Sequence, residues 1–165
     1  MRYQLYRLKH YLNASITVPS DSSTTAPHTW EFSFEMTRMN PEASSFDDME
    51  TQIAQTFASY QGVVLNQTVP FDSTLPPTLE NLCEYFKCRV KERLLHFGWL
   101  LLLVEISETP NRSYAINLIE EAKEVLSPPA LQNPTNKVIP PAAVPPEIEA
   151  EVTRILARMS REKSI

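Results

Sequence analysis

The clearest pattern in the chain is an alternation of large apolar and polar side chains over residues 28–38. The apolar positions of this stretch are Trp30, Phe32, Phe34 and Met36. A period of two is typical of a strand with one buried face. Residues 2–16 show a weaker version of the same pattern, with Tyr6, Leu8 and Leu12 on one side. We therefore predict a long antiparallel hairpin, with residues 17–27 as a polar loop between its two strands.

Helical spacing replaces this alternation from Phe46 onward. The apolar positions of the first predicted helix are Phe46, Met49, Ile53 and Phe57. Acidic residues fill its first turn, where they suit the helix dipole. A second helix of about 18 residues is predicted between a capping Thr78 and Gly98. Its apolar face consists of Leu82, Phe86, Val90 and Leu94.

Two further strands complete the pattern. Residues 99–107 are almost continuously apolar and predict a central strand, with residues 113–117 as its hairpin partner. The order ββααββ predicts an α+β fold, in which two helices cover one face of a four-stranded antiparallel sheet.

The character of the chain changes after residue 118. We expect a short helix over residues 119–126, then a Pro-rich extended linker over 127–146. An amphipathic C-terminal helix is predicted over 147–163, with the apolar stripe Ile148, Val152, Ile155, Leu156 and Met159. The predicted organisation is therefore a domain over residues 1–118 and a tail over residues 119–165.

Composition narrows the class of protein. The 165 residues include 42% hydrophobic side chains, enough for one domain with a core. The net charge of −5 argues against non-specific nucleic-acid binding, which needs a basic surface. No apolar run is long enough to span a bilayer, and the N-terminus lacks the apolar core of a signal peptide, so we expect a cytoplasmic protein. With only two glycines, the chain has no Gly-rich phosphate-binding loop.

The segment Glu108-Thr109-Pro110 is the strongest candidate for a binding site. It follows directly after the apolar strand and turns the chain, which places the Glu108 carboxylate beside a possible pocket. A carboxylate can accept two hydrogen bonds from an amino-pyrimidine edge such as that of a pterin. The alternative is a turn carboxylate paired with Arg112.

Several short segments, taken in order, resemble the 6-pyruvoyl/6-carboxy tetrahydropterin synthase family of the tunnelling fold. They are Leu12-Asn13-Ala14-Ser15, Pro27-His28-Thr29-Trp30, Phe46-Asp47-Asp48, Leu65-Asn66, Pro77-Thr78-Leu79-Glu80-Asn81 and Glu108-Thr109-Pro110. The resemblance covers residues 1–118. It implies ligand-binding roles for Glu108, Thr109, Thr78 and His28. It also implies a homo-oligomer, a trimer or hexamer joined through sheet edges, with the pocket between subunits. Glu108 and the segment carrying His28 could then meet across an interface.

The departures from the family pattern concern its chemistry. The family holds zinc with three histidines, and the matching positions here are Ile16, Ala26 and His28. Isoleucine and alanine offer no lone pair, so we expect no zinc. Ser22 stands where the family has its catalytic cysteine. Gln61 and Gly62 stand where it has a catalytic Asp-His pair. We therefore expect no catalytic residue of the family kind and no other cofactor.

Three functions remain open at this point. The first is a catalytically degenerate, zinc-free relative that acts as an oligomeric module, either regulatory or binding a pterin or purine-like molecule. The second is a divergent enzyme that still processes pterins with other residues. The third is a structural oligomer that docks a partner through its C-terminal helix. No nucleic acid or membrane is expected as a partner. A lone histidine such as His28 is more often structural than a metal ligand, and Thr78 is at least a helix cap.

Overall fold

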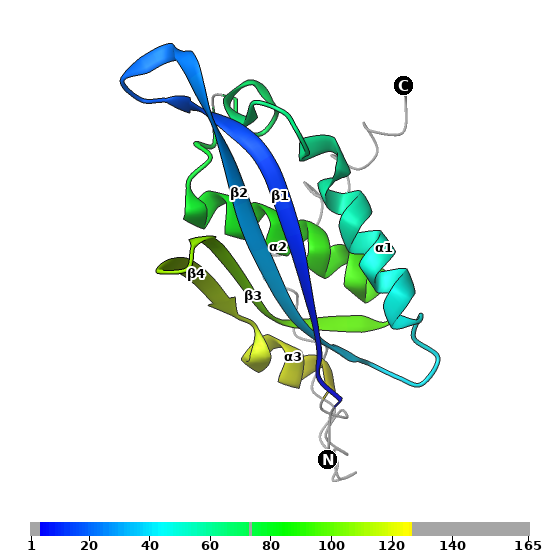
Figure 1. Ribbon diagram of the computed structural model, residues 1–165. Coiled ribbons are helices and arrows are strands. Elements are labelled where there is room, and N and C mark those ends of the chain that lie inside the picture. The colour runs from blue at the N-terminus through cyan, green and yellow to red at the C-terminus, as the bar shows by residue number, and fades with distance from the viewer. Residues whose placement is uncertain (1–3, 73, 127–165) are drawn as a thin grey trace, which may run out of the picture. The chain divides into compact units, whose positions relative to one another are not determined.

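A four-stranded antiparallel sheet in the order β1-β2-β3-β4 forms the centre of the protein. The structure, a computed structural model, describes residues 4–72 and 74–126. Its strands are β1 (Tyr6–Val18), β2 (Asp21–Arg38), β3 (Trp99–Thr109) and β4 (Arg112–Asn117). Its helices are α1 (Phe46–Phe57), α2 (Leu79–His96) and α3 (Ile119–Leu126), with short 3-10 turns at Ala58–Tyr60 and Leu65–Gln67. The predicted ββααββ order is confirmed, and α1 and α2 cover one face of the sheet (Figure 1).

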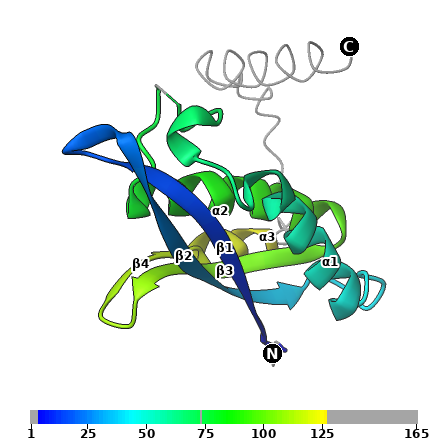
Figure 2. The same cartoon turned by 45° about the horizontal axis from the view of Figure 1, so that its top comes forward.

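The hairpin is longer than the sequence pattern predicts. The prediction of a polar loop over residues 17–27 is wrong, because β1 runs to Val18 and β2 begins at Asp21. The tip of this hairpin extends past the N-terminal end of α2 (Figure 2). All residues from 19 to 25 are exposed, so neither face of the tip meets the core. Without a buried face there are no apolar positions to alternate, and the strand signal disappears.

The apolar stripe of β2 forms the centre of the core. Its four large side chains are at most 2% exposed. Phe57 of α1 and Phe86 of α2 stack with their ring centroids 4.1 Å apart. Phe32 meets both rings edge-on, at 4.9 and 5.2 Å. Such edge and stacked geometries add about 0.5–1.5 kcal/mol per pair to the burial of the rings. This aromatic cluster joins the sheet to both helices.

Both long helices begin at side-chain caps. Ser45 and Asp48 form a reciprocal capping box at the start of α1. The Thr78 hydroxyl accepts a hydrogen bond from the Asn81 backbone N–H, so the predicted cap of α2 is confirmed. Such caps typically stabilise a helix by about 1 kcal/mol each.

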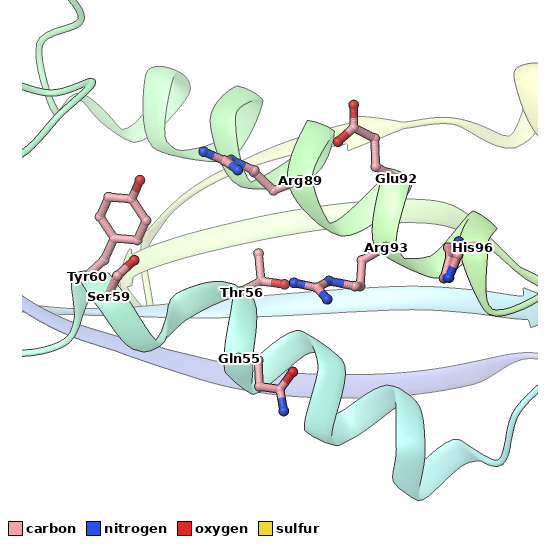
Figure 3. Close-up of a pocket in the computed structure, with 8 residues that line it drawn as sticks. All are labelled: Gln55, Thr56, Ser59, Tyr60, Arg89, Glu92, Arg93 and His96. Carbon is pink, nitrogen blue, oxygen red and sulfur yellow. The ribbon is translucent and has the colours of Figure 1, made fainter. Parts of the chain in front are cut away.

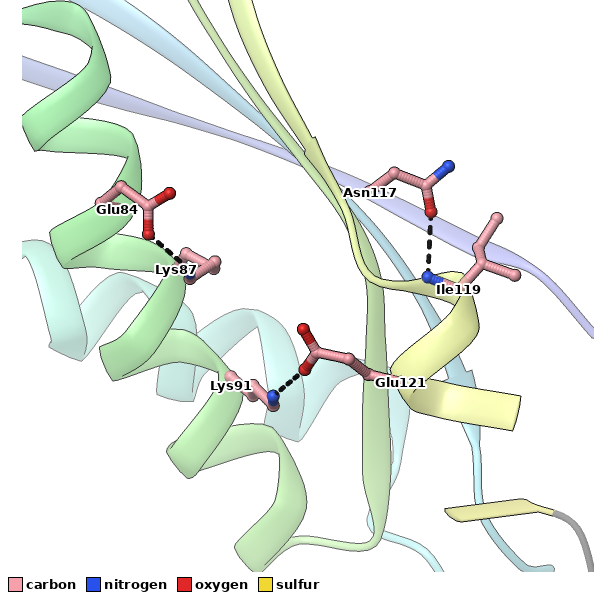
Figure 4. A network of polar contacts seen from close by, with 6 residues as sticks. All are labelled: Glu84, Lys87, Lys91, Asn117, Ile119 and Glu121. Carbon is pink, nitrogen blue, oxygen red and sulfur yellow. Dashed lines mark hydrogen bonds and ion pairs between the residues drawn. The ribbon is translucent and has the colours of Figure 1, made fainter. Parts of the chain in front are cut away.

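The short helix α3 has the predicted bounds and packs on the domain. The Leu118 N–H donates to the Leu102 carbonyl at 2.8 Å and continues the β3–β4 pairing. The Asn117 side chain accepts from the Ile119 N–H at 2.9 Å, at the start of the helix, and Glu121 forms an ion pair with Lys91 of α2 (Figure 4). The predicted linker over 127–146 and helix over 147–163 lie outside the residues that the structure describes. Within those that it describes, no helix is long and apolar enough to cross a membrane.

The two glycines have left-handed backbones but different surroundings. Gly98, between α2 and β3, has φ +82°, and a Cβ there would lie 3.1 Å from the Cβ of Ala43. Gly62 has φ +72°, and nothing lies within 4 Å of an added Cβ. A side chain would therefore strain the backbone at both positions, but it would meet a steric clash only at Gly98.

We predict that Gly98→Ala destabilises the protein more than Gly62→Ala. The left-handed conformation should cost each variant about 1–2 kcal/mol. The contact with Ala43 should add roughly 1 kcal/mol or more at Gly98 alone. Urea unfolding monitored by tryptophan fluorescence measures both values, with Gly62→Ala as the matched control. Equal losses of unfolding free energy in the two variants would show that the α2–β3 turn tolerates the extra methyl group.

Candidate functional site

The Glu108 carboxylate lies between two basic side chains at the end of β3. The strand extends two residues beyond its predicted end, and a register irregularity between Ser107 and Thr109 interrupts the pairing at Glu108. Such bulges redirect a side chain. The Glu108 Oε1 lies 3.0 Å from the His28 Nδ1, and its Oε2 lies 3.4 Å from the Arg112 Nη1.

This contact joins two of the predicted site residues within one chain. An interface between subunits is therefore not needed to bring His28 and Glu108 together. Their side chains are 26% and 22% exposed, so the pair is partly sheltered from solvent. The predicted pairing of Glu108 with Arg112 is also present, although the Arg112 side chain is 67% exposed. Exposed pairs of this kind contribute about 0–1 kcal/mol, so Arg112 is a weak competitor for the carboxylate.

Trp30 holds the His28 ring from one side. The two rings are stacked, with centroids 5.2 Å apart and planes 14° apart. Both residues lie on the same face of β2, two positions apart, so the period of the strand could have identified Trp30 as part of this site.

The other two predicted ligand-binding residues have structural surroundings. Thr109 pairs with Arg112 across the β3–β4 turn. Thr78 caps α2, and Asn81 of the same segment donates its side-chain N–H to the Pro76 carbonyl at 2.9 Å. The N-terminal end of α2, which Thr78 caps, lies toward the β3–β4 turn (Figure 1). Among the described residues no hydrogen bond or ion pair joins Thr78 to the His28–Glu108–Arg112 cluster.

The three positions that the resemblance assigns to zinc ligands lie together. In the β1–β2 register Ile16 is directly opposite Ala26, and Ala14 is opposite His28. Directly opposed residues have Cβ atoms about 4.5–5.5 Å apart, and alternate residues share a face. The positions thus have the arrangement of a three-ligand site, but only His28 has a donor atom. These residues do not fit zinc. Within the described part of the chain no group of three His, Cys, Asp or Glu side chains could hold a metal.

Gln61 and Gly62 hold the edge of β1. The Gln61 side chain accepts from the Asn13 N–H at 2.9 Å and donates to the Tyr11 carbonyl at 2.7 Å. The Gly62 N–H donates to the Asn13 carbonyl at 2.7 Å. Asn66 of the same loop accepts from the Thr17 N–H at 2.7 Å. The segment where the family has its Asp-His pair therefore acts here as a covering for a sheet edge.

Two candidate nucleophiles, Ser22 and Cys83, are poorly placed for chemistry. Ser22 is exposed at the hairpin tip. Its neighbour Asp21 accepts hydrogen bonds from the Ser23 and Thr24 hydroxyls, which lower the pKa of the Asp21 carboxyl and leave it a weak base. Cys83 is buried on α2, and burial raises the pKa of its thiol to about 12. A thiol with such a pKa is protonated at neutral pH and does not act as a nucleophile.

The comparison with known proteins gives one family. The family model described as 6-pyruvoyl tetrahydropterin synthase matches residues 4–118. No curated protein matches the sequence. The structure resembles 6-pyruvoyl tetrahydropterin synthase of Caenorhabditis elegans, with 15% identity, a TM-score of 0.59, and coverage of 71% of this chain and 96% of that one. The enzyme of Plasmodium falciparum has 11% identity, a TM-score of 0.48, and coverage of 69% and 96%. The sheet and helices are thus those of the tunnelling fold, and the chain belongs to the 6-pyruvoyl tetrahydropterin synthase family.

Proposed function

We propose that the protein is a catalytically degenerate, zinc-free member of this family that binds a pterin or purine-like molecule at Glu108. The observation that carries the proposal is the register of β1 and β2. It brings Ile16, Ala26 and His28 to one place, where two of the three side chains are hydrocarbon. A zinc-bound substrate oxygen, on which the chemistry of the family relies, has no protein ligand set here.

The loss of acid and base groups supports the same conclusion. Gln61 does not titrate, and both ends of its amide are bound to the backbone of β1. Gly62 has no side chain, and Ser22 is a much weaker nucleophile than a thiolate. The residues at the three catalytic positions therefore offer no proton relay.

Binding can survive this loss because it needs only the carboxylate. An ionised carboxylate has about four lone-pair directions. His28 and Arg112 use one direction on each oxygen, so capacity remains for two hydrogen bonds from an amino-pyrimidine edge. The His28 ring, stacked on Trp30, would limit how a flat ligand can lie against Glu108.

The sheet edges favour an oligomer. Residues 61–66 cover only the second half of the β1 edge, from Tyr11 to Thr17. The first half of β1 and the outer edge of β4 have no backbone partner among the described residues. Unpaired edges of this kind are commonly covered by another strand. Pairing of β1 with β4 of a second subunit would produce the ring, a trimer or hexamer, that the resemblance implies.

Adding the two missing imidazoles should create a zinc site. Unmodified protein should carry no stoichiometric zinc, whereas Ile16→His combined with Ala26→His should bind one zinc per chain together with His28. Three imidazoles on one face complete the ligand set of a catalytic zinc site. Elemental analysis of untagged protein after dialysis against zinc measures the result. Ile16→His alone is the control, because it supplies only two imidazoles. One zinc per chain in the unmodified protein would overturn the proposal.

We predict that dihydroneopterin triphosphate is not converted. General acid and base groups contribute about 10²–10⁴-fold each, so the loss of several together with the metal should leave no measurable rate. The assay is chromatography of the pterin products after prolonged incubation with added zinc. A metal-dependent product above the heat-killed control would support the alternative of a divergent enzyme.

A pterin or guanine-like compound should raise the melting temperature, and Glu108→Ala should abolish the shift. Loss of a bidentate, charge-assisted pair should weaken binding by about 2–4 kcal/mol. Glu105→Ala, on the same strand, is the matched control and should retain the shift. If Glu108→Ala binds as well as the unmodified protein, the site is elsewhere. If no such compound binds at all, the structural-oligomer alternative gains support.

A further inference from the structure

A polar groove runs between α1 and α2, away from the Glu108 site. Its volume is about 440 Å³, and its lining comes from α1, the turn after it, and the second half of α2. Figure 3 shows the eight lining side chains: Gln55, Thr56, Ser59, Tyr60, Arg89, Glu92, Arg93 and His96. Pockets of roughly 300–1,000 Å³ accommodate small molecules, so the groove is large enough for one.

Most of the lining can donate hydrogen bonds. Gln55 and Ser59 are one turn apart on the α1 side, and Arg89 and Arg93 are one turn apart on α2. Glu92 is the only carboxylate among the lining residues, and its side chain points away from α1 (Figure 3). Arg93 extends toward Thr56 in the same view. A groove rich in donors and nearly free of carboxylates fits a ligand that has only acceptors, as a phosphate does.

Two arginines of α2 lie one turn apart beside the groove. Arg93 and His96 lie in the last turn, where a positive charge suits the helix dipole. Arg89 lies two turns before the end, beyond the reach of that effect. The two arginines nevertheless place two guanidinium groups beside the groove, which an anionic ligand can contact.

Two tyrosines beside the groove, Tyr85 and Tyr60, hold Arg89 in position. The Arg89 Nε and Nη2 donate to the Tyr85 hydroxyl at 3.1 and 2.8 Å, and the guanidinium lies 5.2 Å from the centroid of that ring. The Tyr85 and Tyr60 hydroxyls are 2.5 Å apart. Burial and this hydrogen bond raise the pKa of Tyr60 to about 12, so the phenol stays neutral and adds no negative charge to the groove.

Arg93 is less tied to the protein. Its Nη1 donates to the neutral Gln52 side chain at 3.2 Å, and no ion pair among the described residues includes it. A guanidinium with one neutral partner keeps donors for the bidentate contact that arginine makes with phosphate.

We propose that the α1–α2 groove is a second ligand site, which binds the phosphate or diphosphate group of a small molecule. Arg93 contacts the anion directly, Arg89 supplies a fixed second charge, and Gln55 of α1 and Ser59 of the turn after it donate from the opposite side. The site does not involve Glu108, whose carboxylate would repel the same ligand.

The test is calorimetric titration of the full chain with inorganic pyrophosphate at constant ionic strength. We expect saturable binding that Arg93→Gln weakens about tenfold or more, since a charge-assisted bond is lost. Ser59→Glu, which places a carboxylate across the groove and leaves both arginines intact, should weaken it similarly. Lys123→Gln removes one positive charge from the exposed surface of α3 and should leave the affinity unchanged. Glu108→Ala should also leave it unchanged.

Three results would contradict an anion site in this groove. One is the absence of saturable pyrophosphate binding. Another is equal weakening by Lys123→Gln and Arg93→Gln, which would indicate general attraction to positive charge. The last is unchanged affinity in Ser59→Glu, with a melting temperature that shows it to be folded.

Discussion

The register between β1 and β2 is the constraint on which the rest of the structure depends. It is fixed by the apolar stripe of β2, because a slip of one residue would move the buried aromatic face into solvent. The aromatic cluster of Phe32, Phe57 and Phe86 then positions both helices. The same register sets Ile16 opposite Ala26 at the other end of the hairpin. One constraint therefore sets both the core and the relative positions of Ile16, Ala26 and His28.

The elements that the sequence predicted well are those with a buried face. The period-two stripe of β2, the apolar faces of α1 and α2, and the capping Thr78 are all local signals, and each agrees with the structure. The hairpin tip could not be predicted in this way, since both its faces meet solvent. The extra length of β3 depends on its pairing with β4, which a local pattern does not contain.

The candidate site was predictable only in part. Glu108 and His28 could be named from short segments and from chemistry, and Arg112 from its spacing along the turn. Their meeting within one chain depends on the bulge near Ser107 and on the β2–β3 register, both of them long-range features. The α1–α2 groove left no signal at all, because Gln55 and Arg93 read as ordinary solvent-facing positions of two amphipathic helices. It exists only through the packing of those helices on the sheet.

The chain keeps the fold of an enzyme family, and we propose that structural side chains stand where the family has its catalytic ones. Gln61, bound at both ends of its amide, is the clearest example. The most direct test is native mass spectrometry of freshly purified, untagged protein, which reports the assembly, its metal and any small molecule that stays bound. We expect a homo-oligomer without zinc that releases a pterin or purine-like compound on denaturation. One zinc retained per chain, with no such compound released, would contradict this expectation.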